Sequence, residues 1–145
     1  MTRKLDIRPF THDDLAEILA IENASFSDPW NKSKFEEELN IQYSLHYAAA
    51  IDKNICGYII VWYAGGEFHI LNIAVSPAQR RKGIAKALIS FITDLAVQKG
   101  VTGTFLEVRS KNEAALRLYA ESGFTKYGIR KKYYPDDDAV LMRRP

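Results

Sequence analysis

Hydrophobic residues recur along this chain with two periods, one typical of helices and one typical of strands. The clearest helical stripe has i, i+3, i+4, i+7, i+8 and i+11 spacing and consists of Ile84, Ala87, Leu88, Phe91, Ile92 and Leu95. Gly83 precedes this stripe and Gly100 follows it, as is typical of a helix start and a C-terminal cap. The pattern therefore predicts a long amphipathic helix between these two glycines.

Three further helices are predicted from shorter patterns. Thr11 has the character of an N-cap, with Asp14 three residues later as a capping-box variant, and the apolar stripe behind them fades near Ser25. A second, short helix is favoured by two apolar positions, Phe35 and Leu39. The last is predicted over 112–122, where Gly123 ends it.

Strand-type runs fill most of the remaining chain. They are bounded by turn residues such as those at 52–54 and Gly65-Gly66. The predicted strands span residues 5–9, 47–51, 55–63, 67–75, 104–108, 124–131 and 139–142. This order of elements predicts an α/β fold in which a mixed sheet of about seven strands is flanked by four helices. Because the sequence has no linker and no internal repeat, we expect a single domain over 1–145.

Composition narrows the function classes. A length of 145 residues with 47% hydrophobic and 26% charged residues is ordinary for a globular domain. The formal net charge of +2 is too small to predict a nucleic-acid partner. Cys56, the single cysteine, lies in an apolar run, so a buried structural thiol is expected rather than a disulfide or a reactive group.

Several other classes are disfavoured. No apolar segment approaches the roughly 18 residues of a membrane span, and the charged N-terminus lacks the apolar stretch of a signal peptide, so a soluble, cytoplasmic protein is expected. His12, His46 and His69 lie far apart in sequence without cysteine partners, so no metal site is expected. A monomer without membrane or nucleic-acid partners is the resulting expectation.

The strand, loop and helix start over 75–86 could carry chemistry. Unpaired backbone amides and the helix dipole at a helix N-terminus attract anions. Gly83 allows a phosphate to approach the backbone, and Arg81, Lys82 and Lys86 add positive charge. A solvated basic helix start is the alternative. Neither the P-loop spacing nor the dinucleotide-binding glycine fingerprint is present.

The same loop carries a family resemblance. Arg80, Gly83 and Ala85 match the loop of the GNAT acetyltransferases, which has Gln or Arg, two residues, Gly, one residue, then Gly or Ala. In that family the loop binds the pyrophosphate of acetyl-coenzyme A (acetyl-CoA). The whole chain resembles the family, so the resemblance implies the GNAT fold and acetyl-CoA as co-substrate.

Three segments resemble one branch, the bacterial ribosomal-protein alanine acetyltransferases of the RimI type. They are 106–124, 26–30 and 130–135, the last with the Tyr-Tyr-Pro element shared with other N-terminal acetyltransferases. In this chain Ser27-Asp28 separates Phe26 from Pro29-Trp30, whereas the branch has a tighter spacing. The resemblance implies transfer of an acetyl group to a protein N-terminal amine, the alanine of a small-subunit ribosomal protein.

The resemblance also implies roles for particular residues. Glu107 takes the general-base position and Tyr119 the general-acid position. The acceptor groove would be lined by Trp30, Tyr133 and Tyr134, from two loops. The cofactor-contact positions are Ile73, Ala74, Val75, Arg80, Arg81, Lys82, Gly83, Ile84, Ala85, Lys86 and Asn112.

Each assignment has a structural alternative. The role of Glu107 could be limited to an ion pair with Arg109. Tyr119 could be a core residue, and Asn112 could be an N-cap. The groove aromatics could be packing residues. The acid run at 136–138 either makes an acidic mouth that favours basic residues after the acceptor amine or is a solvated turn.

The function has alternatives as well. The acceptor could be a lysine side chain or a small amine. A different class is a non-catalytic acyl-CoA-binding module, which would need neither Glu107 nor Tyr119.

Overall fold

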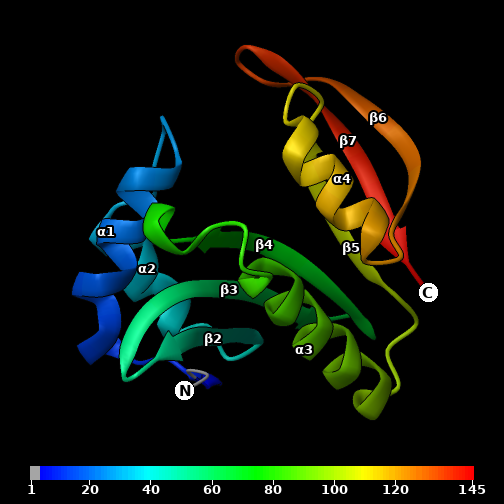
Figure 1. Ribbon diagram of the computed structural model, residues 1–145. Helices are drawn as coiled ribbons and strands as arrows, with labels where there is room; N and C mark the ends of the chain where they lie inside the picture. The colour runs from blue at the N-terminus through cyan, green and yellow to red at the C-terminus, as the bar shows by residue number, and fades with distance from the viewer. Residues whose placement is uncertain (1–3) are drawn as a thin grey trace.

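The computed structural model describes residues 4–145 (Figure 1). Its seven strands lie in one sheet. The sheet order is β1-β2-β3-β4-β5-β7-β6, and β4 and β5 form the one parallel pair among them. The strands are β1 Leu5–Pro9, β2 Ser44–Ile51, β3 Asn54–Ala64, β4 Glu67–Val75, β5 Thr104–Arg109, β6 Thr125–Tyr134 and β7 Asp137–Arg144.

Four α-helices cover the two faces of this sheet. They are α1 Leu15–Ser25, α2 Lys32–Leu39, α3 Ile84–Lys99 and α4 Glu113–Glu121. Helices α1 and α2 pack on one face, and α3 and α4 pack on the other, each with its own hydrophobic cluster. Short 3-10 turns at His12–Asp14 and Pro77–Gln79 precede α1 and the loop to α3. The predicted α/β architecture and order of elements are confirmed.

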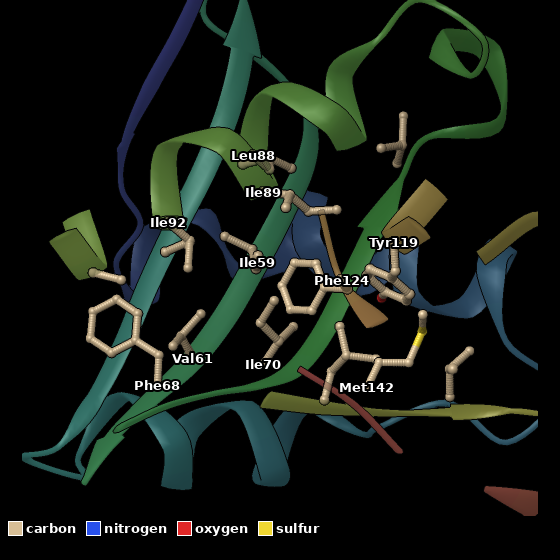
Figure 2. Packing of buried hydrophobic residues seen from close by; sticks show 14 of the residues in the cluster. Ile59, Val61, Phe68, Ile70, Leu88, Ile89, Ile92, Tyr119, Phe124 and Met142 are labelled. Atoms are coloured by element: carbon tan, nitrogen blue, oxygen red, sulfur yellow. The ribbon is translucent and has the colours of Figure 1, made fainter. Parts of the chain in front are cut away.

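Successive residues of the central strand β3 are apolar, without the alternation of apolar and polar residues that a half-buried strand has. Ile59 and Val61 point toward α3, where Leu88 and Ile92 meet them (Figure 2). Tyr58 and Ile60 belong to the cluster under α1 and α2. A strand buried on both faces needs apolar residues at successive positions.

Gly57 lets α3 approach β3 closely. A Cβ atom added there would lie 3.0 Å from the Ala74 carbonyl oxygen and 3.3 Å from the Ile84 side chain. The first turn of α3 is therefore seated directly on β3 and β4. The neighbouring Cys56 is 3% exposed and its thiol donates to the Ala49 carbonyl, so the prediction of a buried structural thiol is confirmed.

The C-terminal hairpin differs from its prediction. Residues 132–134 belong to β6 and residues 137–138 to β7, so the predicted loop over 132–138 shrinks to Pro135 and Asp136. Lys132 has a φ of 55°, and its amide donates to the Asp138 carboxylate at 2.8 Å. This side-chain bond holds an irregular stretch of β6 against β7, a contact that no strand pattern signals.

Other element boundaries differ from their predictions by a few residues. Strand β2 starts at Ser44 rather than residue 47, and α1 starts at Leu15 because Thr11 caps the 3-10 turn before it. Within residues 4–145 no helix is both long and apolar enough to cross a membrane. That part of the chain also has no group of three or more His, Cys, Asp or Glu side chains placed to hold a metal ion.

Candidate active site

The candidate site lies where β4 and β5 part. The two strands pair only over Phe68–Ile70 and Thr104–Leu106, and beyond this point they diverge (Figure 1). The register of β4 against β3 skips Leu71, so one extra residue follows directly after Ile70. A bulge bends its strand, which accounts for the separation of the last halves of β4 and β5.

A pocket of about 180 Å³ adjoins the separated end of β4. Val75 of β4 and Leu118 of α4 form two of its walls, and the α3 loop forms the third. Its lining includes most of the residues predicted to contact a cofactor, namely Val75, Arg80, Arg81, Gly83, Ile84, Ala85 and Lys86. The fold thus collects these predicted positions around one hollow.

The loop ahead of α3 has the backbone conformation of an anion site. Arg81 and Gly83 have φ values of 65° and 78°, and Gly83 is the N-cap of α3. Left-handed residues beside a helix N-terminus build concavities lined with backbone N–H groups. A Cβ at Gly83 would meet no heavy atom within 4 Å, so glycine is favoured there by its φ rather than by crowding.

The basic side chains of this loop are not equivalent. Arg80 donates to the Val75 carbonyl and to the Ser25 hydroxyl, both at 3.1 Å, and so ties the loop to β4 and to the end of α1. Lys82 donates to Gln79, and Lys86 pairs with Glu121 at 3.1 Å. Among residues 4–145, Arg81 has no such partner, so its charge is the one most available to a ligand.

Glu107 follows the last β5 residue that pairs with β4. Its side chain is 34% exposed, and one carboxylate oxygen lies 3.5 Å from the Arg130 guanidinium. The predicted alternative of an ion pair with Arg109 is wrong, because Arg109 pairs with Asp136. A hydrogen bond to Glu107 raises the pKa of Tyr133, and burial adds to this rise.

Tyr119 lies deeper, on the inner face of α4. Only 6% of its surface is exposed, and its ring packs against Phe124 at 5.9 Å (Figure 2). Burial raises the pKa of this phenol, and the nearby Tyr134 adds to the rise. Tyr119 is therefore a core residue whose hydroxyl keeps its proton at physiological pH.

The two tyrosines at the end of β6 form a cluster with arginines. Their rings lie 5.0 Å apart in a T-shaped pair. Arg130 lies over Tyr133 at 5.3 Å, and Arg109 lies over Tyr134 at 4.3 Å. Neither Arg130 nor Arg109 was among the predicted site residues, since the strand pairing brings them to these rings.

The acid run after these tyrosines is largely used inside the hairpin. Asp136 accepts from Arg109, and Asp137 accepts from the Ser110 hydroxyl, and these hydrogen bonds lower the pKa of each carboxyl. Asp138 accepts from the Lys132 amide at 2.8 Å. These bonds favour the turn interpretation of the run over the acidic-mouth hypothesis.

Trp30 lies apart from the tyrosines, in the α1–α2 loop. Its ring packs on Phe35 at 5.3 Å, and the Lys34 ammonium lies 5.1 Å from the ring centre. Figure 1 shows this loop and the β6–β7 turn at the same end of the sheet, on either side of the opening between β4 and β5. Within residues 4–145, the ring contacts of Trp30 are with Phe35 and Lys34 and not with Tyr133 or Tyr134.

The remaining predicted positions have mixed surroundings. Ala74 is buried and Ile73 half-buried on the separated part of β4. Asn112 is the N-cap of α4, where its side chain accepts from the Ala115 amide at 3.1 Å, so the capping interpretation is confirmed. Its place as a cofactor neighbour stays a prediction.

The family is shown by comparison with known proteins. The model of the acetyltransferase (GNAT) family matches residues 15–124. A Bacillus subtilis (strain 168) protein with the provisional name ribosomal protein bS18-alanine N-acetyltransferase is 33% identical, over 98% of this chain and 96% of its own length. This chain belongs to the GNAT acetyltransferases. It is accordingly an acetyl-CoA-dependent N-acetyltransferase.

Two further relatives come from Escherichia coli. The ribosomal protein bS18-alanine N-acetyltransferase of strain K12 is 32% identical, over 91% of this chain and 91% of its own length. The crystal structure of the E. coli ribosomal-protein-S18-alanine N-acetyltransferase superposes on this structure with a TM-score of 0.92 at 29% identity. The superposition covers 98% of this chain and 94% of the E. coli chain. The resemblance to the RimI-type branch is confirmed.

The geometry of this acetyltransferase suits acyl transfer between two substrates. Glu107 comes from β5, at the point where that strand leaves β4 and the opening between them begins, and Tyr119 comes from α4. A carboxylate and a phenol are groups that can take part in proton transfer, and amide formation requires two such transfers. The pocket at the α3 loop lies on the β4 side of the same opening.

Proposed function

We propose that this acetyltransferase transfers the acetyl group of acetyl-CoA to the N-terminal α-amine of a protein, with the N-terminal alanine of a ribosomal protein as its acceptor. The observation that carries this proposal is the position of Glu107. It is the first residue of β5 beyond the pairing with β4, and it contacts Arg130 and Tyr133 of the hairpin. The names of the bS18-alanine N-acetyltransferases, which this chain matches over most of its length, support the alanine acceptor.

The donor is assigned to the pocket at the α3 loop. Its phosphates would meet the N-terminus of α3, with Arg81 as the unpaired cation and Gly83 as the point of closest backbone approach. Lys86 would join once it leaves Glu121, an exposed pair whose separation costs little. The acetyl-CoA thioester supplies the activated acyl group, and the separated part of β4 would hold it.

The amine must lose a proton to react. An α-amine with a pKa of about 7.7 to 8.0 is about a tenth neutral at pH 7, whereas a lysine amine with a pKa of about 10.4 is about one part in 2,500 neutral. An N-terminal acceptor therefore needs only modest help from a base. Glu107, directly or through a water molecule, would take the proton that the amine loses when the new C–N bond forms.

Negative charge also develops on the carbonyl oxygen and on the leaving sulfur, and other groups would stabilise or neutralise it. Backbone amides near Ala74 and Val75 would stabilise the negative charge that develops on the carbonyl oxygen. Tyr119 would donate a proton to the sulfur as the C–S bond breaks, and the free thiol would then leave. No covalent intermediate on the protein is required, which agrees with the buried and protonated state of Cys56.

The proposal is tested with a matched pair of peptides that begin Ala-Arg and contain one internal lysine. One peptide has a free N-terminus and the other is blocked there. Mass spectrometry after incubation with acetyl-CoA should find one acetyl group, on the α-amine of the free peptide, and none on the blocked one. Acetylation of the blocked peptide at a comparable rate would instead support a lysine acceptor.

A further inference from the structure

Glu22 is a buried carboxylate that the reaction outlined above does not use. It lies in the last turn of α1 and is 1% exposed. The other fully buried glutamate, Glu38, has Lys34 at 3.4 Å, but within residues 4–145 no lysine or arginine pairs with Glu22. Since a buried charge is costly without compensation, the groups that surround Glu22 must supply it.

Three uncharged donors surround this carboxylate. One oxygen accepts from the Tyr58 hydroxyl and, at 2.8 Å, from the Asn72 side-chain amide. The other oxygen accepts from the backbone amide of Trp30 at 2.8 Å. One carboxylate thus joins β3 and β4 to the α1–α2 loop, and each of its two oxygens serves a different side.

Both ends of this bridge lie at the candidate site. Asn72 directly follows the bulge residue Leu71, where β4 leaves β5. Trp30 belongs to the α1–α2 loop, and Figure 1 shows this loop at the end of the sheet where the two strands separate. The Trp30 ring packs on Phe35 of α2, and the Trp30 backbone amide is linked to the sheet through Glu22.

We propose that Glu22 is a positioning residue, which fixes the α1–α2 loop against the bulged part of β4 and thereby shapes the acceptor side of the cleft. It touches neither substrate. This inference rests on the proposed function, in which Trp30 lines the groove for the acceptor amine. A loop released from Glu22 would hold the acceptor-binding conformation only part of the time. The apparent affinity for the acceptor is then reduced by the fraction of molecules in that conformation.

The test is Glu22→Gln, with Tyr58→Phe as its matched control. Glutamine keeps the shape and one acceptor oxygen, which can stay with Tyr58 and Asn72, but its NH₂ group cannot accept from Trp30. Phenylalanine at 58 removes a buried hydroxyl from the same cluster and leaves the bond to Trp30 in place. Each variant loses one of the hydrogen bonds that Glu22 accepts. Tyr58→Phe loses the bond from the Tyr58 hydroxyl, and Glu22→Gln loses the bond from the Trp30 amide, so only Glu22→Gln releases the loop.

Glu22→Gln should raise KM for the N-terminal peptide by about 10-fold to 100-fold, the factor that loss of a charged hydrogen bond represents. Its kcat and its KM for acetyl-CoA should stay within about twofold of wild type, and Tyr58→Phe should change none of the three beyond that range. An unchanged peptide KM in Glu22→Gln, or an equal rise in both variants, would overturn the proposal.

Amide hydrogen exchange of the wild-type protein adds a test that needs no variant. The Trp30 amide should exchange slowly for a loop residue, because it donates to a buried carboxylate. Exchange as fast as that of neighbouring loop amides would refute the role of Glu22, even if Glu22→Gln failed to fold. If wild type acetylated no peptide N-terminus but the Trp30 amide were protected, the proposed acceptor would be wrong and the anchoring by Glu22 would stand.

Discussion

Glu107 keeps 34% of its side chain in solvent, whereas the Tyr119 phenol lies in the core beside Phe124. A carboxylate open to solvent can be reached by an incoming amine or by a water molecule. A buried phenol keeps its proton and can therefore donate it. The two environments therefore match the roles of base and acid that the family resemblance implies.

At the residue scale, Glu107→Gln and Tyr119→Phe should each lower turnover by roughly 10² to 10⁴, the usual range for one positioned proton-transfer group. Their affinity for acetyl-CoA, measured by calorimetry, should barely change. Glu113→Gln, an exposed carboxylate change in the first turn of α4, is the control and should retain turnover. If both site variants kept wild-type turnover with chemistry rate-limiting, the assigned roles would be incorrect.

The pH dependence of turnover tests the acid separately. Loss of the proton from an N-terminal amine raises kcat/KM as pH increases through about 8. Tyr119 has a raised pKa, so its proton stays in place beyond pH 10 and should cause no decline below that pH. A rate profile from pH 6 to 10 should rise to a plateau, and a Tyr119-dependent fall near pH 9 would contradict this assignment.

At the scale of elements, the α3 loop combines a helix N-terminus with two left-handed residues, Arg81 and Gly83. Local sequence chemistry decides most of this arrangement, because glycine adopts positive φ without cost and the helix dipole begins immediately after it. The side chains of the loop are decided by the rest of the fold. Arg80 binds Val75 and Ser25, and Lys86 pairs with Glu121 of α4.

Gly83→Asp should abolish the rise in melting temperature that acetyl-CoA gives the wild-type protein, because a carboxylate would occupy the expected phosphate position. Gly83→Asn is the matched control, since it has nearly the same shape and the same left-handed backbone cost without the charge. Differential scanning fluorimetry should show a larger remaining shift for Asn than for Asp. Equal shifts in wild type and Gly83→Asp would exclude this loop as the cofactor site.

At the scale of the whole molecule, buried tyrosines couple stability to alkaline pH. Burial raises the pKa of Tyr119, and burial together with Glu22 raises that of Tyr58. A pKa raised on folding gives stability that is complete below the unfolded value of about 10 and is lost as pH rises toward the folded value. The free energy of unfolding should therefore fall above about pH 10.

Each such tyrosine should contribute about 1.4 kcal/mol per pH unit to the decline above pH 10. Urea unfolding at several pH values should show a shallower decline in Tyr58→Phe and in Tyr119→Phe, and the shallowest in the double variant. Lysine titration in the same range is common to all four proteins, so the differences report the tyrosines. Parallel declines in wild type and both single variants would rule out this coupling.

The sequence by itself determined the order and type of the elements, because hydrophobic period and turn residues act over a few positions. The stripe from Ile84 to Leu95 predicted α3 between its two glycines, and the structure places the helix there. The motif of Arg80, Gly83 and Ala85 predicted an anion-binding loop ahead of α3, since the chemistry of such a loop is local. The predicted end of β6 was wrong, because its extension depends on the Lys132 amide meeting Asp138.

Tertiary structure decided which residues meet. The partner of Glu107 is Arg130 rather than Arg109, since register across β5, β7 and β6 determines which charges lie near each other. Gly57 and Glu22 carried no signal in the sequence, because their importance comes from a close helix approach and from donors as far as 50 positions away. Local periodicity predicts elements, but burial and pairing between distant segments give side chains their environment.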